Sequence, residues 1–161
     1  SFGLNVGLVF GAIALVLAEF NEKTEIIRKL IAEYAQKSSK YSRQITIIDK
    51  EDESLSFADL ILQGIDGYKP AQTEYKADWN WIFGIGKQRV EHIVSNKHRR
   101  SYDKAAQVLG SMAEIYAALG AEQKASRLID EFCKEKFSRH TAFKREVQTV
   151  LKISGFGIYK M

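Results

Sequence analysis

The first 18 residues of the chain, SFGLNVGLVFGAIALVLA, contain no charged side chain, and Gly3, Gly7 and Gly11 recur in them every fourth residue. This glycine spacing is typical of a helix that another helix can approach closely. A helix without charge must be covered, either by lipid or by the rest of the protein. Because a membrane span needs about 20 apolar residues, we predict a buried core helix, with a membrane anchor as the alternative.

The rest of the chain favours helices over strands. Its 161 residues suit one domain, and 45% apolar with 27% charged residues is the composition of a folded protein. Pro70 is the only proline. We therefore predict an all-α fold of about seven helices, an array of antiparallel hairpins around the buried N-terminal helix. The chain begins at Ser1, so either an initiator methionine is removed or the chain is a fragment of a larger protein. We expect the second.

Charge divides this single domain into two parts. We expect an apolar and acidic helical part over residues 1–67, a loop around Pro70 over 68–78, and a basic helical part over 79–161. Residues 1–80 carry 9 Lys or Arg against 12 Asp or Glu, whereas residues 81–161 carry 15 against 8. Basic residues concentrated on one side indicate an acidic partner or a nucleic acid.

The basic part opens with WIFGIGKQRVEHIV, residues 81–94. An apolar run, a Gly-apolar-Gly turn and a basic helix resemble the helix-hairpin-helix family of DNA-binding modules. The resemblance implies that backbone N–H groups near Gly84 and Gly86 hold a phosphate while Lys87 and Arg89 supply charge. Val90 stands where the family has a small residue, which favours the other interpretation, a bend leading into a helix that faces the core.

Residues 109–132 contain Tyr116, Gly120 and Ala125 at offsets of four and five. This pattern resembles one tetratricopeptide unit, in which a small residue after the turn lets the second helix press on the first. No second copy follows at a 34-residue period, so a long solenoid is not predicted. An ordinary helical hairpin remains the equal alternative. In either case we predict that Gly120 ends the first helix.

A wider resemblance covers roughly the last 70 residues. HRRSYDKAAQVL at 98–109, AEIYAALG at 113–120 and FSRHTAFKREV at 137–147 resemble the C-terminal helical region of bacterial SWIM-type zinc-finger proteins. The zinc of that family is bound by Cys-x-Cys and Cys-x-His pairs elsewhere in the chain. Here Cys133 is the only cysteine, so no zinc ligand is carried over, and the resemblance implies a helical appendage that serves interaction.

Four basic side chains are our candidates for contacting an acidic partner: Lys97, Arg99, Arg100 and Arg139. The first three are expected at a helix C-terminus, where cations are stabilised by the helix dipole. Arg139 is expected near a helix start, where it needs a compensating anion. That anion is either Asp103 or Glu135 within the chain, or an external one. Three aromatic residues are candidates for an apolar anchor to a partner: Trp79, Trp81 and Phe83.

Catalytic and metal-binding patterns are not found. His92, His98, His140 and Cys133 are not spaced as a compact zinc site, and no nucleophile elbow, Walker loop or His-Glu-x-x-His motif occurs. A single cysteine suits a reducing compartment, so we expect the cytoplasm. We predict a non-enzymatic module without a cofactor that binds a protein partner. The alternatives are non-specific DNA binding and membrane anchoring.

Overall fold

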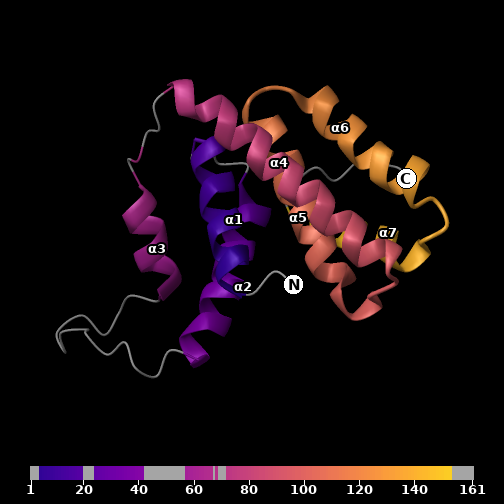
Figure 1. Ribbon diagram of the computed structural model, residues 1–161, viewed down its shortest axis with the longest axis horizontal. Helices are drawn as coiled ribbons and strands as arrows, with labels where there is room; N and C mark the ends of the chain where they lie inside the picture. The colour runs from indigo at the N-terminus through magenta and orange to yellow at the C-terminus, as the bar shows by residue number, and fades with distance from the viewer. Residues whose placement is uncertain (1–3, 20–23, 42–56, 67, 69–71, 154–161) are drawn as a thin grey trace.

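Helices make up most of the described part of the chain. A computed structural model describes residues 4–19, 24–41, 57–66, 68 and 72–153 (Figure 1). Within these residues there are seven α-helices, a 3₁₀ turn (η1), a π-helical segment (η2) and no strand. Their bounds are α1 Leu4–Leu17, α2 Glu25–Tyr41, α3 Phe57–Ile65, α4 Gln72–Ser95, η1 Arg99–Ser101, α5 Tyr102–Ala118, α6 Glu122–Asp130, η2 Glu131–Lys136 and α7 Thr141–Leu151. The all-α prediction is confirmed, whereas a regular array of antiparallel hairpins stays a prediction.

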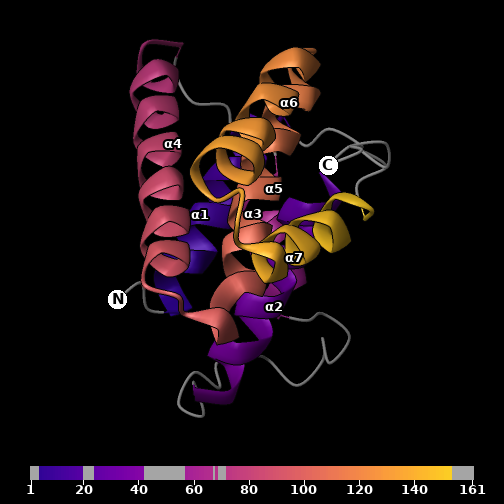
Figure 2. The ribbon, with the colours of Figure 1, turned by 90° about the vertical axis from the view of Figure 1, so that its right-hand side faces the viewer.

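Helix α5 is the centre of the fold. It packs against α1, α2, α4, α6 and α7, and Figure 2 shows it in the middle of the molecule, with α4 on its left. Thirteen of its residues are buried, around its whole circumference. Many of these are alanine, glycine or serine, and such small side chains let several helices approach one axis closely. A helix buried on every side is the expected core of a larger helical assembly.

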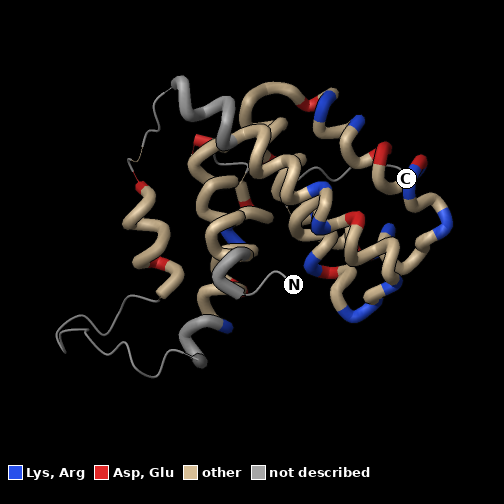
Figure 3. Tube along the Cα trace, viewed as in Figure 1, with Lys and Arg blue, Asp and Glu red and all other residues tan. Residues whose placement is uncertain are grey.

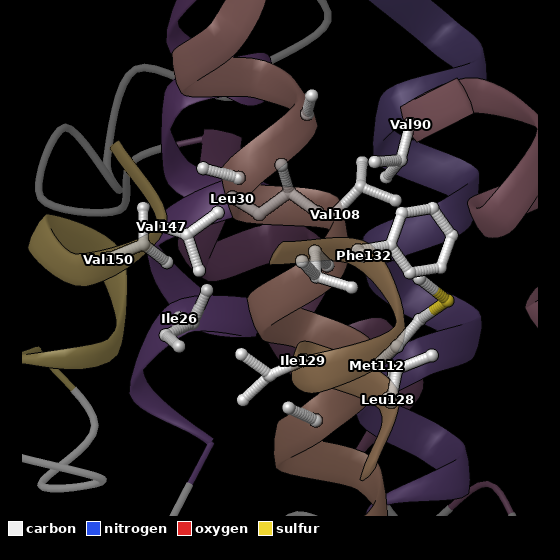
Figure 4. Close-up of a cluster of buried hydrophobic side chains, with 14 of the residues drawn as sticks. Ile26, Leu30, Val90, Val108, Met112, Leu128, Ile129, Phe132, Val147 and Val150 are labelled. Atoms are coloured by element: carbon white, nitrogen blue, oxygen red, sulfur yellow. The ribbon is translucent and has the colours of Figure 1, made fainter. Parts of the chain in front are cut away.

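The buried side chains of the other helices converge on α5 in one cluster. Figure 4 shows Ile26 of α2, Phe132 of η2 and Val150 of α7 directed into this region. Helix α3 differs, because none of its residues is buried, and it lies beside α1 and α2 on the side away from α6 and α7 (Figure 1). The core is therefore built by α1, α2 and α4 to α7.

The charge-free N-terminal segment forms the core helix that the sequence predicts. In α1, Phe10, Ala14 and Leu15 are buried. A Cβ atom built on Gly7 would lie 2.5 Å from the ring of Tyr34, and one on Gly11 would lie 2.7 Å from Ile31 Cγ1, both on α2. The glycines therefore permit close contact between the two helices, as expected. Gly3 lies outside the described residues.

Across the part of the chain that the structure describes, no helix is both long enough and apolar enough to cross a membrane.

The predicted turn at Gly84-Ile85-Gly86 is wrong, because α4 runs without interruption from Gln72 to Ser95. Neither glycine has a positive φ. The predicted loop over 68–78 is also too long, since α4 begins within it; Pro70 itself lies outside the described residues. Tertiary packing overrides the local glycine signal here: a Cβ atom on Gly86 would meet Met112 Sδ at 2.7 Å and Phe10 Cε2 at 3.2 Å. Gly86 therefore lies where α4 comes close to α1 and α5.

Two helices end in the same left-handed turn, one with glycine and the other with lysine. After α5, Gly120 has φ +71°, and the N–H groups of Gly120 and Ala121 donate to the carbonyls of Ala117 and Tyr116 at 3.0 and 2.8 Å. The predicted stop at Gly120 is confirmed. After α4, Lys97 has φ +56° and the same bonding pattern. This is the Schellman motif, in which glycine is the favoured residue.

Replacing Lys97 with glycine should stabilise the fold by about 0.5–1 kcal/mol, because a left-handed backbone is strained for any residue with a Cβ atom. The mirror change, Gly120→Ala, should destabilise it by about 1 kcal/mol. Lys97→Gln removes the same charge without relieving the backbone and serves as the control. Urea denaturation of the three variants measures these differences. A lower stability of Lys97→Gly than of Lys97→Gln would contradict the assignment of backbone strain.

Candidate interaction surface

Seven of the fifteen basic residues of the C-terminal part lie in two segments around the starts of α5 and α7. We define the basic end as residues 97–104 and 139–146, which together carry seven Lys or Arg and two Asp or Glu, against a net charge of +4 for the whole chain. The remaining residues therefore have a net charge of about −1. Figure 3 shows most Lys and Arg positions in the half of the molecule formed by α4 to α7, with some Asp and Glu positions among them.

A single aromatic contact joins the two segments of the basic end. The rings of Tyr102, the first residue of α5, and Phe143, in the first turn of α7, meet edge to face with centroids 5.9 Å apart. Both side chains are buried. Arg99 and Arg100 precede Tyr102 by two or three residues, and Arg139 precedes Phe143 by four. Packing between α5 and α7 therefore places the starts of these two helices, which the predicted basic candidates precede, next to each other.

The local backbone keeps these side chains at the surface. Lys97, Arg99 and Arg100 are exposed in the turn between α4 and α5. Lys97 directly follows the last turn of α4, as predicted. Arg99 and Arg100 instead open η1, which leads into the start of α5, so the predicted helix C-terminus is wrong for these two. Arg139 is exposed in the turn between η2 and α7. Buried Phe137, whose ring packs edge to face on Phe143 at 6.1 Å, anchors that turn from below.

Arg139 makes no ion pair with any described residue. The sequence left open whether Asp103, Glu135 or an external anion would compensate it. Neither Asp103 nor Glu135, both of which are described and exposed, is bonded to it in the structure. An external anion for Arg139 stays a prediction.

The residues of the DNA-binding alternative do not form a phosphate-binding turn. Gly84 and Gly86 lie inside α4, where backbone N–H groups are already bonded to carbonyls one turn earlier. Lys87 Nζ lies 3.0 Å from Glu131 Oε2, so its charge is compensated within the protein. Arg89 is half-buried and also has a partner within the chain. The hairpin-based grip on phosphate has no geometric basis in this fold.

The contact of Lys87 belongs to an ion-pair network between α4 and η2. Lys136 bonds Glu131 at 3.0 Å and also Glu91. Partial burial acts to raise the pKa of Glu131, but the hydrogen bonds from Lys136 and Lys87 outweigh it and hold that pKa below its usual value. Bonds to Glu91 and Glu131 raise the pKa of Lys136. These charges hold η2 against α4 and are separate from the basic end.

The three aromatic candidates divide between the interior and the surface. Trp79 stacks on Phe83 with ring centroids 4.9 Å apart, and Tyr116 of α5 packs against both. Phe83 is only 7% exposed, whereas Trp81 is 46% exposed. Trp79 and Phe83 are one helical turn apart and so share the face of α4 that meets α5. The prediction of a surface anchor is wrong for Phe83, and Trp81 alone of the three points outward.

One notch among the described residues is too small for a small-molecule ligand. A notch between α1, α2, α4 and α5, lined by Gly7, Tyr34, Gly86 and Arg89 among others, has a volume of about 20 Å³, enough for about one water molecule. No group of three or more His, Cys, Asp or Glu side chains in this part of the chain is arranged to hold a metal. Burial raises the pKa of Cys133 to about 11, which keeps its thiol protonated and unreactive.

Sequence reasoning missed one polar site, the carboxylate of Glu114 on α5. Glu114 is 0% exposed, and its two oxygens accept the backbone N–H groups of Ile26 and Ile27 at 2.7 and 2.8 Å. A glutamate between Ala113 and Ile115 in an otherwise apolar run was the available signal. Its bonding partners lie 87 and 88 residues earlier, which no local pattern indicates.

Comparison of the chain with models of protein families, with curated proteins and with solved structures finds no match. The resemblances to a tetratricopeptide unit and to the helical region of SWIM-type proteins therefore stay predictions.

Proposed function

We propose that this chain is a non-enzymatic helical interaction module whose basic end binds an acidic surface of a protein partner. The observation that carries the proposal is the convergence of two separate basic segments through the contact of Tyr102 with Phe143. More positive charge gathers there than the whole chain has in net terms. A concentrated field of this kind speeds the encounter with an acidic partner and orients it.

The side-chain types of the basic end suit carboxylates. Four of its seven cations are arginines: Arg99, Arg100, Arg139 and Arg145. A guanidinium can donate two parallel hydrogen bonds to one carboxylate, which gives orientation as well as attraction. The candidates Lys97, Arg99, Arg100 and Arg139 are exposed and form no ion pair with the other described residues. A partner can therefore engage them without first breaking an internal salt bridge.

A protein partner is favoured over a nucleic acid by the two acidic residues within the basic end. Asp103 and Glu146 would repel a continuous row of phosphates, whereas a protein surface can oppose each of them with a basic side chain of its own. Gly84 and Gly86 also lie inside a continuous helix and form no hairpin, so they do not support the DNA alternative. The half-exposed Trp81 lies on α4, outside the basic end, and is not needed for this contact.

Reversing the charge of the basic end should abolish binding of an acidic peptide. The triple variant Arg99→Glu, Arg100→Glu, Arg139→Glu is expected to weaken the binding of a peptide of alternating Asp and Ser by more than about tenfold, because six units of charge change at the contact. The matched control Lys29→Glu, Lys124→Glu, Arg127→Glu changes net charge equally at exposed positions of α2 and α6, and should weaken binding only about twofold. Fluorescence anisotropy of the labelled peptide measures both.

Equal losses in the two triple variants would show that only net charge matters and would contradict a defined surface. A 20-base-pair DNA duplex serves as the competing ligand. Tighter binding of the duplex than of the peptide at 150 mM salt, with a steep dependence on salt concentration, would replace the protein partner with a nucleic acid.

A further inference from the structure

A buried carboxylate joins two helices that are distant in sequence. Glu114 Oε1 accepts the N–H of Ile26 at 2.7 Å, and Oε2 accepts the N–H of Ile27 at 2.8 Å. Both amides belong to the first turn of α2, where helix N–H groups have no partner within the helix. Glu114 thus caps α2 from α5.

The residue before α2 does not supply these bonds. Thr24 is fully buried, and its Oγ1 accepts a hydrogen bond from Arg28 Nε at 3.2 Å. A threonine at this position ordinarily accepts from the first-turn amides itself. Here Glu114 supplies the acceptors for the amides of Ile26 and Ile27, so these hydrogen bonds between α2 and α5 depend on one carboxyl group.

Few charged side chains of the described residues surround this carboxyl group. From α2, Glu25 acts to raise its pKa and Arg28 to lower it. Within one helical turn on either side in α5, residues 110–118 include no other charged side chain, and α1 contains none. The buried residues of α6 and α7 are apolar, and α3 has no buried residue. The surroundings of Glu114 are therefore mainly apolar, apart from the two amides.

We propose that Glu114 is a pH-sensitive contact, which holds α2 against α5 while it keeps its proton and favours local opening of α2 once the proton is lost. The direction of this pH effect follows from the burial of Glu114. Burial raises the pKa of Glu114 to about 8, although the N–H groups of Ile26 and Ile27 act to lower it. Opening exposes the carboxyl to water, where it ionises near its ordinary value. Between those two values the closed form binds a proton that the open form releases, so rising pH promotes opening. This inference does not depend on the proposed function.

Hydrogen exchange at α2 tests this proposal directly. After correction for the intrinsic exchange rate, the opening constant at the amides of Ile26 and Ile27 should rise about fiftyfold between pH 6 and pH 8 if opening exposes Glu114 fully. The amides of Ile129 and Val147, in α6 and α7, should change much less. Glu114→Gln cannot titrate and should show no such rise.

An opening constant at Ile26 that is flat over this range, or that rises equally in Glu114→Gln, would overturn the proposal. If Glu114→Gln does not fold, a ¹³C-detected titration of the Glu114 carboxyl in the wild-type chain decides the matter. A midpoint near pH 8 supports the proposal, and a midpoint below pH 6 overturns it.

Discussion

Gly110→Ala should destabilise the fold by about 3 kcal/mol, because it adds a methyl group where three helices cross. A Cβ atom on Gly110 would lie 2.7 Å from Val150 Cγ1 and 2.9 Å from Ile26 Cδ1. Both neighbours are branched and buried, so neither can turn away without disturbing the core. The expected cost is therefore at the upper end of what one added methyl group causes.

Alanine substitution at two glycines of α4 should change stability less than at Gly110. A Cβ atom on Gly84 would meet no other atom within 4 Å, so Gly84→Ala should stabilise the helix by about 1 kcal/mol through helix propensity alone. Gly86→Ala should cost about 1 kcal/mol, because its nearest neighbour, Met112 Sδ, belongs to a flexible side chain. Urea denaturation gives the three values. Destabilisation by Gly84→Ala would contradict a continuous α4 and restore the turn at Gly84-Gly86.

Glu114→Ala should cost about 3 kcal/mol at pH 6, since it leaves two buried N–H groups without an acceptor and empties part of the core. The wild-type chain should also lose stability as pH rises. The pKa of Glu114 is raised by burial to about 8, so the folded chain keeps a proton that the unfolded chain releases from about pH 5 upward. The free energy of unfolding then falls by up to about 1.4 kcal/mol per pH unit until pH 8.

Glu114→Gln is the matched control, because it keeps one acceptor oxygen and nearly the same volume but cannot titrate. The unfolding free energy of the wild type minus that of Glu114→Gln should therefore fall as pH rises from 5 to 8, because only the wild type loses stability. A constant difference over this range, measured by urea denaturation at fixed ionic strength, would show that Glu114 is already ionised at pH 5.

Local sequence patterns predicted the elements whose causes are local. The charge-free run with Gly7 and Gly11 has to be covered, and it became α1. Gly120 ends α5 because only the left-handed conformation closes that turn. The expected place of Arg139 near a helix start is confirmed, since it lies two residues before α7, whereas its need for an anion stays a prediction.

The features that sequence reasoning missed depend on contacts across the fold. Gly86 looks like a turn residue, but Phe10 and Met112, far away in the chain, fill the space above it and stabilise an unbroken helix. Phe83 was predicted to be an exposed anchor, but the ring of Tyr116 on α5 packs against it. The gathering of basic residues follows from the meeting of Tyr102 with Phe143, which neither segment indicates alone.

The central claim is that residues 97–104 and 139–146 act as one surface for an acidic partner. Backbone amide shifts of the ¹⁵N-labelled chain, followed during titration with the Asp-Ser peptide, test it most directly. We predict that amides of both segments shift together with a single dissociation constant, while those around Lys87 and Arg89 change little. Shifts centred on Lys87 and Arg89, or confined to one of the two segments, would contradict it.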